Sequence, residues 1–283
     1  MNAFQAIILG IVQGLTEFLP ISSTAHLRII PALLHWDDPG TAFSAFIQLG
    51  TVFAVIIYFW KDVTRIYLSL FSELFMWITG KSSKLLSSFN SKIALWVLLG
   101  TIPICVFGLI LKKPLESGLL RGLNTIGFSL IFFGVLLYIS ELCGKQIKIL
   151  KDITIVDVFL IGFSQSLALI PGVSRSGVTL LTALFLGLKR YEAARFSFLL
   201  SIPAVILSGI LETYTLITYI SNSGEKLPWI NLVVGVLFAF ISGYIAIDFL
   251  LKYLQNHRTT LFVVYRVLLG AFIIYLSCAS VIR

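Results

Sequence analysis

The feature that most constrains the fold of this chain is the recurrence of apolar stretches of about 20 residues, the length at which a helix crosses a bilayer. Six full spans are expected at 41–60, 93–112, 123–143, 196–219, 229–251 and 261–282. The composition agrees, because 58% of the residues are hydrophobic and 12% are charged, whereas about a quarter of a soluble domain is charged. The sequence therefore predicts an all-α polytopic membrane protein.

Two further apolar regions, 3–35 and 154–188, are interrupted in the middle by proline and small polar residues. The interruptions are 20–24 (PISST) and 171–176 (PGVSRS). Two short helices that meet at such a turn form a re-entrant hairpin, which enters and leaves the membrane on the same side. Irregular backbone at that depth is tolerated only where protein or a wet cavity surrounds it. We therefore expect each break to face a cavity.

The two interrupted regions and the segments after them resemble one another. Gln13 corresponds to Gln165 at an offset of 152 residues, and 54–57 corresponds to 204–207 at an offset of 150. With one hairpin and three spans in each half, the second copy is inverted in the membrane, which places a site between the halves. The expected organisation is one membrane domain, 1–283, with a first repeat at 1–143 and an inverted second repeat at 154–283.

The net charge of +8 comes from basic residues in short loops between apolar segments. This pattern indicates membrane topology rather than a nucleic-acid partner. If loop 61–92 is cytoplasmic, thirteen basic residues share its side: Lys61, Arg65, Lys81, Lys84, Lys92, Lys145, Lys148, Lys151, Lys189, Arg190, Arg195, Lys252 and Arg258. Five lie opposite: Lys112, Lys113, Arg121, Lys226 and Arg283. The positive-inside rule then places both termini outside the cytoplasm.

The first break carries a carboxylate within an apolar segment, where a charge costs about 2.5–3.5 kcal/mol on insertion scales. Gln13 and Glu17 are four residues apart and share one helix face. With Ser23 as N-cap of the next helix, His26 falls one turn on, where its imidazole can approach the serine hydroxyl. A hydroxyl with a histidine and a carboxylate is typical of an activated nucleophile. Plain helix capping is the alternative, most of all for Ser22 and Thr24.

The second break places Arg175 between Ser174 and Ser176 at the start of a helix that continues through Thr179. A helix N-terminus binds anions through its free N–H groups, and arginine adds a planar fork of donors that suits phosphate oxygens. This pattern predicts an anion site. A structural ion pair between Arg175 and Glu17 is the alternative, and both interactions fit one site. Of the remaining charges, Arg266 is interpreted as a packing or pairing residue, and 64–92 as a surface amphipathic stretch.

Two long motifs give the chain a resemblance to a known family. Residues 13–26 (QGLTEFLPISSTAH) match a (Glu/Gln)-x-x-x-Glu motif with a serine-rich turn, and 171–179 (PGVSRSGVT) match Pro-Gly-x-Ser-Arg-Ser-x-x-Thr. The sequence thus resembles undecaprenyl-diphosphatase, the bacitracin-resistance type of bacterial membrane phosphatase, over essentially its whole length. Ala25 stands where the family usually has glycine. The resemblance implies hydrolysis of a polyprenyl diphosphate lipid to its monophosphate, which recycles the carrier lipid for peptidoglycan. It also implies location in the bacterial plasma membrane with the site on the outer face.

On this resemblance, the expected catalytic residues are Glu17, Ser23, His26 and Arg175, and the expected substrate-binding residues are Gln13, Ser22, Thr24, Ser174, Ser176 and Thr179. Ser23 is the expected nucleophile, and direct attack by water is the alternative. No cofactor and no metal site are assigned, although a divalent cation (Mg or Ca) between Glu17 and the diphosphate is chemically reasonable. The expected partners are the lipid substrate and membrane lipids, and a homodimer is compatible with the sequence. A transporter or lipid-carrier flippase for an anionic substrate is the competing function, because carriers also use inverted repeats with broken helices.

Overall fold

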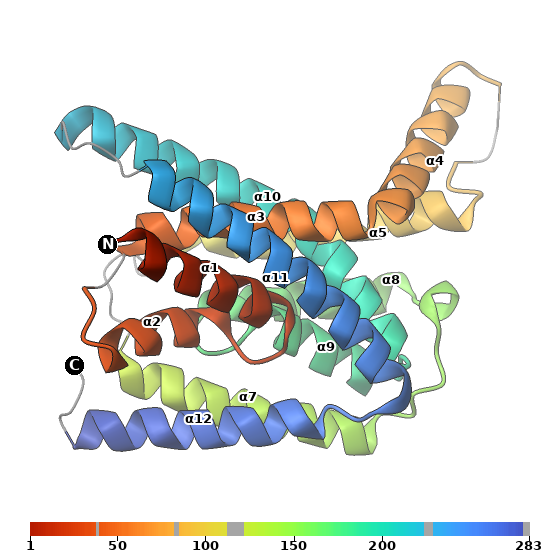
Figure 1. The fold of residues 1–283 in the computed structure, drawn as a ribbon. Coiled ribbons are helices and arrows are strands. Elements are labelled where there is room, and N and C mark those ends of the chain that lie inside the picture. Colours follow the sequence, from red (N-terminus) through yellow and green to blue (C-terminus); the bar gives the residue numbers. More distant parts are fainter. Residues whose placement is uncertain (38–39, 82–84, 112–121, 224–228, 280–283) are drawn as a thin grey trace.

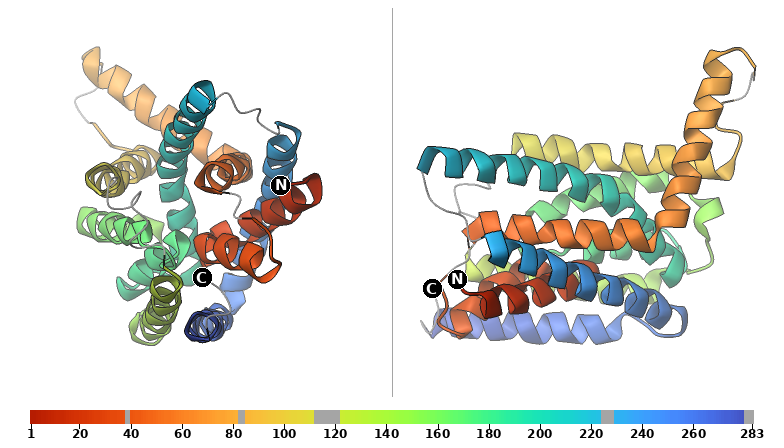
Figure 2. Two further views of the ribbon diagram at one scale, coloured as in Figure 1. Left: turned by 90° about the vertical axis from the view of Figure 1, so that its left-hand side faces the viewer. Right: turned by 45° about the horizontal axis from the view of Figure 1, so that its top comes forward.

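The computed structural model describes residues 1–37, 40–81, 85–111, 122–223 and 229–279. The regular elements in these ranges are helices, which run along a common direction in one bundle except for α4 (Figures 1 and 2). In chain order they are α1 (Ala3–Phe18), α2 (Ser23–Leu33), α3 (Gly40–Tyr58), α4 (Trp60–Ile78), α5 (Phe89–Ile110), α7 (Leu123–Cys143), η1 (Leu150–Asp152), α8 (Ile155–Ser166), η2 (Leu167–Leu169), α9 (Arg175–Phe185), α10 (Arg190–Ser223), α11 (Trp229–Asn256) and α12 (Thr260–Cys278). The predicted all-α architecture is confirmed.

Five helices of the described ranges are long and apolar enough to cross a bilayer. They are α5, α7, α11, α12 and the Arg190–Leu211 part of α10, and they correspond to five of the six predicted spans. The sixth prediction, 41–60, falls on α3. Its Phe46–Tyr58 part qualifies together with α4, from which it is bent by 75°. The protein is therefore an integral membrane protein, and its described ranges hold five such spans, or up to six if the bent pair counts as one.

The two interrupted regions form two pairs of short helices. α1 runs inward from the end of the bundle where the N-terminus lies, and α2 returns to that end (Figure 1). α8 runs inward from the opposite end of the bundle, and α9 returns to that end. Each returning helix begins after a serine with a left-handed backbone, Ser22 with φ 74° and Ser174 with φ 69°. The N-cap of α2 is thus Ser22 and not the predicted Ser23, because the chain turns at Ser22 and Ser23 is already helical.

Small residues bring each entering helix close to a long helix of the other half of the chain. A Cβ atom on Gly10 of α1 would lie 2.4 Å from the carbonyl oxygen of Gly235 on α11. A Cβ atom on Gly162 of α8 would lie 2.3 Å from the carbonyl oxygen of Gly100 on α5. Backbones that approach this closely are typical of helix packing in membranes. These contacts hold α1 and α8, and therefore the turns that follow them, inside the bundle.

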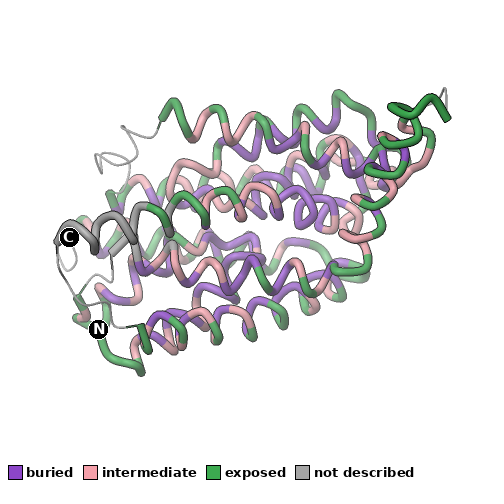
Figure 3. Tube along the Cα trace, turned by 90° about the horizontal axis from the view of Figure 1, so that it is seen from above, coloured by how far each residue is buried: buried purple, intermediate pink, exposed green. Residues whose placement is uncertain are grey.

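Helix α4 extends away from the bundle at the end opposite the N-terminus (Figures 1 and 3). Its inner face buries Ile66 and Leu70, and its outer face exposes Leu68, Phe71 and Phe75. The predicted surface amphipathic stretch at 64–92 thus begins on a helix with two distinct faces and ends in the first turn of α5, while 82–84 lie outside the described residues. Figure 3 shows that buried residues gather in the interior of the bundle.

Candidate functional site

The centre of the candidate site is the carboxylate of Glu17 in the last turn of α1. Its Oε2 atom accepts hydrogen bonds from Gln13 Nε2 at 3.0 Å and from Ser23 Oγ at 2.7 Å. Its Oε1 atom lies 2.8 Å from Nη2 of Arg175, which comes from the second turn, 158 residues further along the chain. Gln13 and Glu17 therefore share a helix face as predicted, and the fold joins both motifs at one carboxylate.

Arg175 is the first residue of α9, and its guanidinium lies between the two turns. Besides Glu17, it donates from Nη1 to the carbonyl oxygen of Ser201 on α10 at 3.1 Å. The side chains of Arg175 and Glu17 are 13% and 7% exposed, so little water solvates either charge. The ion pair that the sequence left as an alternative is thus present in the structure. It holds the arginine fork and the Ser23 hydroxyl on the same carboxylate.

The two serines that precede the returning helices share a strained conformation. Positive φ is uncommon for residues other than glycine, and such strain concentrates at functional sites. Ser174 Oγ accepts from the backbone N–H of Gly177 at 3.2 Å and caps α9. Ser22 makes no such cap, and its hydroxyl instead lies 3.0 Å from that of Thr24. One turn is therefore capped by its own serine, while the N–H groups at the start of α2 donate no hydrogen bond to the side chain of Ser22.

The remaining hydroxyls of the two motifs link the turns to each other. Ser176 Oγ donates to the carbonyl oxygen of Leu19 at 3.1 Å, and Gly172 N–H donates to Thr24 Oγ1 at 3.4 Å. Thr179 is buried one turn further into α9, where its hydroxyl donates to the carbonyl oxygen of Arg175 at 2.8 Å and contacts the hydroxyl of Ser197. Thr179 therefore fixes the backbone of Arg175 through a hydrogen bond to its carbonyl oxygen.

His26 makes different contacts from those expected. Its Nδ1 atom lies 2.7 Å from the carbonyl oxygen of Ser22, and its Nε2 atom lies 2.6 Å from the hydroxyl of Tyr265 on α12. The expected approach of the imidazole to the Ser23 hydroxyl is therefore not the arrangement that the structure has. The displaced N-cap explains this difference, since it puts the backbone carbonyl of Ser22 one helical turn before His26. Tyr265 was not predicted, because its partner is 239 residues away.

Arg266, the next residue of α12, is the largest fully buried side chain among the described residues. It was interpreted from the sequence as a packing or pairing residue. In the structure its guanidinium donates to the backbone carbonyl oxygens of Pro20 and Gly172, both at 3.1 Å. These carbonyls belong to the first and the second turn. The sequence signal for this role was the charge itself in the middle of an apolar segment, which marks a functional candidate by default.

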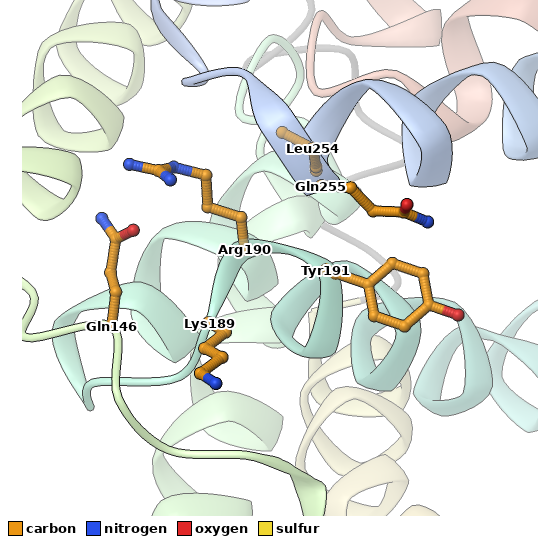
Figure 4. Close-up of a pocket in the computed structure, with 6 residues that line it drawn as sticks. All are labelled: Gln146, Lys189, Arg190, Tyr191, Leu254 and Gln255. Atoms are coloured by element: carbon orange, nitrogen blue, oxygen red, sulfur yellow. The ribbon is translucent and has the colours of Figure 1, made fainter.

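A separate cavity of about 390 Å³ opens where α10 begins and α11 ends (Figure 4). It is lined by Gln146, Lys189, Arg190, Tyr191, Leu254 and Gln255. None of the predicted site residues lines it, and Arg190 is paired with Glu141 at 2.5 Å. We therefore place the chemistry at the two turns, where the polar contacts converge. In the described ranges no cluster of three or more His, Cys, Asp or Glu side chains is placed to hold a metal ion.

Together, the bundle and the joined turns define a polytopic helical membrane protein with a carboxylate, an arginine and serine hydroxyls gathered within it. Residues 6–272 match the family of bacitracin resistance protein BacA, and the chain belongs to this family. Curated relatives are named undecaprenyl-diphosphatase. The relative from Chlorobaculum parvum is 50% identical over 277 residues, with 95% of each chain covered. Those from Pelodictyon phaeoclathratiforme and Gloeobacter violaceus are 45% and 47% identical, and each match covers 100% of this chain and 100% and 94% of the relative.

Proposed function

We infer that this protein hydrolyses undecaprenyl diphosphate to undecaprenyl phosphate and inorganic phosphate. This reaction recycles the lipid carrier for peptidoglycan and cell-wall synthesis, and it underlies resistance to bacitracin. Membership of the family and full-length similarity to relatives named for this activity support the assignment. The observation that carries it within the molecule is the contact of Glu17 with both the Ser23 hydroxyl and the Arg175 guanidinium.

In the mechanism that we propose, Arg175 and the start of α9 hold the diphosphate and stabilise the charge that develops during transfer. Ser23 attacks the terminal phosphorus, and its proton passes to Glu17, whose Oε2 is already 2.7 Å away. The bond from phosphorus to the bridging oxygen breaks, and undecaprenyl phosphate leaves with that oxygen. Water then hydrolyses the phosphoserine. In the alternative mechanism water attacks directly, and Ser23 only hydrogen-bonds to the phosphate.

The other residues of the motifs have supporting roles in this proposal. Gln13 orients Glu17 through its hydrogen bond at 3.0 Å. His26 is the second acid/base group, and its Nε2 lies 2.6 Å from the hydroxyl of Tyr265, an exposed residue of α12. The hydroxyls and backbone around the two turns contact the diphosphate oxygens directly or position the groups that do so, and they belong to Ser22, Thr24, Ser174, Ser176 and Thr179. A divalent cation would take Glu17 as one ligand and diphosphate oxygens as others.

The membrane arrangement that we propose has two re-entrant hairpins and two inverted repeats, 1–143 and 154–283, in one domain. Ser22 and Ser174 support it, because they stand 152 residues apart with the same unusual backbone. The packing of α1 on α11 and of α8 on α5 supports it as well, since each pairs a hairpin with a long helix of the other half. Loop charge orients the N-terminal end of the bundle outward. We propose that the site opens on the outer face of the bacterial plasma membrane.

Phosphate release from the purified full-length protein in detergent tests the assignment. We expect release from undecaprenyl diphosphate and its loss in Glu17→Gln by about 10²-fold or more, as for a missing general acid/base group. The paired broken helices favour a transporter or flippase as the second candidate function. That candidate is supported if the folded protein releases no phosphate but moves a labelled polyprenyl phosphate across sealed vesicles. Phosphate release from the wild type and none from Glu17→Gln excludes it as the sole function.

A further inference from the structure

Arg266 has an environment that is unusual for a charged side chain. It is 0% exposed, and all its hydrogen bonds go to backbone carbonyl oxygens. Nε donates to Leu130 of α7 at 3.2 Å, and Nη1 donates to Pro20 at 3.1 Å. Nη2 donates to Gly172 at 3.1 Å and to Val173 at 2.9 Å. No described carboxylate forms an ion pair with it, so its charge is balanced by carbonyl dipoles alone.

These carbonyls explain why an arginine is needed at this position. A chain that turns within the membrane leaves carbonyl groups without their helical partners, and such groups must be satisfied inside the protein. The planar guanidinium offers five N–H donors spread over three nitrogens in a fixed geometry, whereas the three donors of lysine share one nitrogen. One rigid group thus bonds Pro20 in the first turn and Gly172 and Val173 in the second. The guanidinium therefore bridges the two turns from one side, in addition to the bonds that Ser176 and Thr24 make between them.

Two glycines leave room for this group. A Cβ atom on Gly177 of α9 would lie 2.8 Å from Nη1 of Arg266, and one on Gly134 of α7 would lie 3.2 Å from its Cβ atom. Gly177 is in the first turn of α9, next to Ser176 and two residues from Arg175. The guanidinium therefore lies directly against the part of α9 that carries the phosphate-binding motif.

Arg266 also decides the charge balance of the site. Arg175 and Glu17 form an ion pair, so together they contribute no net charge. The charge of Arg266 has no such partner among the described residues and leaves the two turns net positive. Fixed positive charge in a low-dielectric region raises the local concentration of an anion.

We propose that Arg266 is a positioning residue of the site: it holds the two turns at the separation where Glu17, Ser23 and Arg175 meet one diphosphate, and its charge attracts that anion. This inference rests on the proposed function. It assigns to α12 a part in catalysis that lies outside both sequence motifs. Arg266 thus makes two separate contributions. Its hydrogen bonds place the catalytic groups and affect turnover, while its charge affects the affinity for the substrate.

The test compares Arg266→Lys and Arg266→Met in the purified full-length protein with undecaprenyl diphosphate as substrate. Lysine keeps the charge and loses the fork, so kcat should fall by about 10²-fold while KM changes little, as expected for misplaced catalytic groups. Methionine loses both, so KM should also rise, by about tenfold. Arg190→Lys is the matched control, because Arg190 is a partly buried arginine on Glu141 near the other cavity. It should leave kcat and KM unchanged.

A folded Arg266→Lys variant with wild-type kcat would overturn the inference and leave Arg266 a structural residue. If that variant does not fold, Gly134→Ala decides. The added methyl crowds Arg266, whereas in the control Gly108→Ala the nearest atom, on Leu169, is 4.0 Å away. Alanine favours the helix in both. A lower kcat in Gly134→Ala alone supports the inference, and equal values in the two variants refute it. A wild-type protein without phosphatase activity would refute the proposed function instead.

Discussion

The double replacement Arg175→Met with Glu17→Gln separates the two possible roles of the ion pair. Arg175 Nη2 and Glu17 Oε1 are 2.8 Å apart, and the side chains are 13% and 7% exposed. Removing one member of so buried a pair costs about 3–5 kcal/mol, because the other charge is left unpaired. Replacing both members is often neutral or stabilising by about 1–4 kcal/mol. We therefore expect Arg175→Met alone to lower the melting temperature and the double variant to recover it.

Activity should follow the opposite pattern. The double variant lacks the fork that holds phosphate and the carboxylate that accepts the Ser23 proton. We expect turnover to fall by at least about 10²-fold, which is about 2.7 kcal/mol of barrier. Arg175→Lys should also be severely impaired although it keeps the charge, since lysine cannot make the planar contact. The assay is phosphate release from undecaprenyl diphosphate, measured beside the melting temperature of the same preparation.

The matched control is the pair Arg195–Asp62, which has the same 2.8 Å separation but side chains that are 31% and 26% exposed. Because solvent screens this pair, Arg195→Met with Asp62→Asn should change stability by less than about 1 kcal/mol and leave turnover intact. A double Arg175→Met, Glu17→Gln variant that still releases phosphate at the wild-type rate would refute the phosphate-binding role of Arg175. A single Arg175→Met variant as stable as the wild type would refute the energetic argument.

Three further predictions test the orientation, the histidine and the second helix pair. A cysteine at Ser223 should react with an impermeant reagent added outside intact cells, while one at Ser87 should not; the reverse pattern would invert the topology. Tyr265→Phe removes the hydrogen bond of 2.6 Å to His26 and should lower kcat by about 2- to 10-fold, the equivalent of about 0.5–1.5 kcal/mol; an unchanged kcat would remove Tyr265 from the site. Gln165 is buried, and its amide has no hydrogen-bond partner among the described residues. Because an unsatisfied buried amide costs about 1–3 kcal/mol, Gln165→Leu should raise the melting temperature. A melting temperature below that of the wild type would contradict the absence of hydrogen bonds to this amide.

Much of the architecture follows from the sequence alone, because a bilayer imposes strong local rules. A span must be apolar for about 20 residues, so five predicted spans coincide with helices of the structure. A proline followed by a run of small polar residues located both turns, whereas the isolated Pro31, Pro103 and Pro203 lie inside helices. The shared face of Gln13 and Glu17 needs only the period of the α-helix. The start of α9 at Arg175 follows in the same way from the local capping chemistry of Ser174.

Tertiary structure alone decided which groups meet across the chain. Local pattern placed His26 near a serine hydroxyl, but the positive φ of Ser22 moved the N-cap by one residue, and the packing of α12 supplied Tyr265 as the partner of the imidazole. The contact of Glu17 with Arg175 was one of two alternatives in the sequence and is an ion pair of 2.8 Å in the fold. Arg266 looked like an isolated charge, because the carbonyl groups that it satisfies lie 94 and 246 residues away. Periodicity reports the neighbours of a residue along one helix, whereas these partners depend on how helices from both halves of the chain pack together.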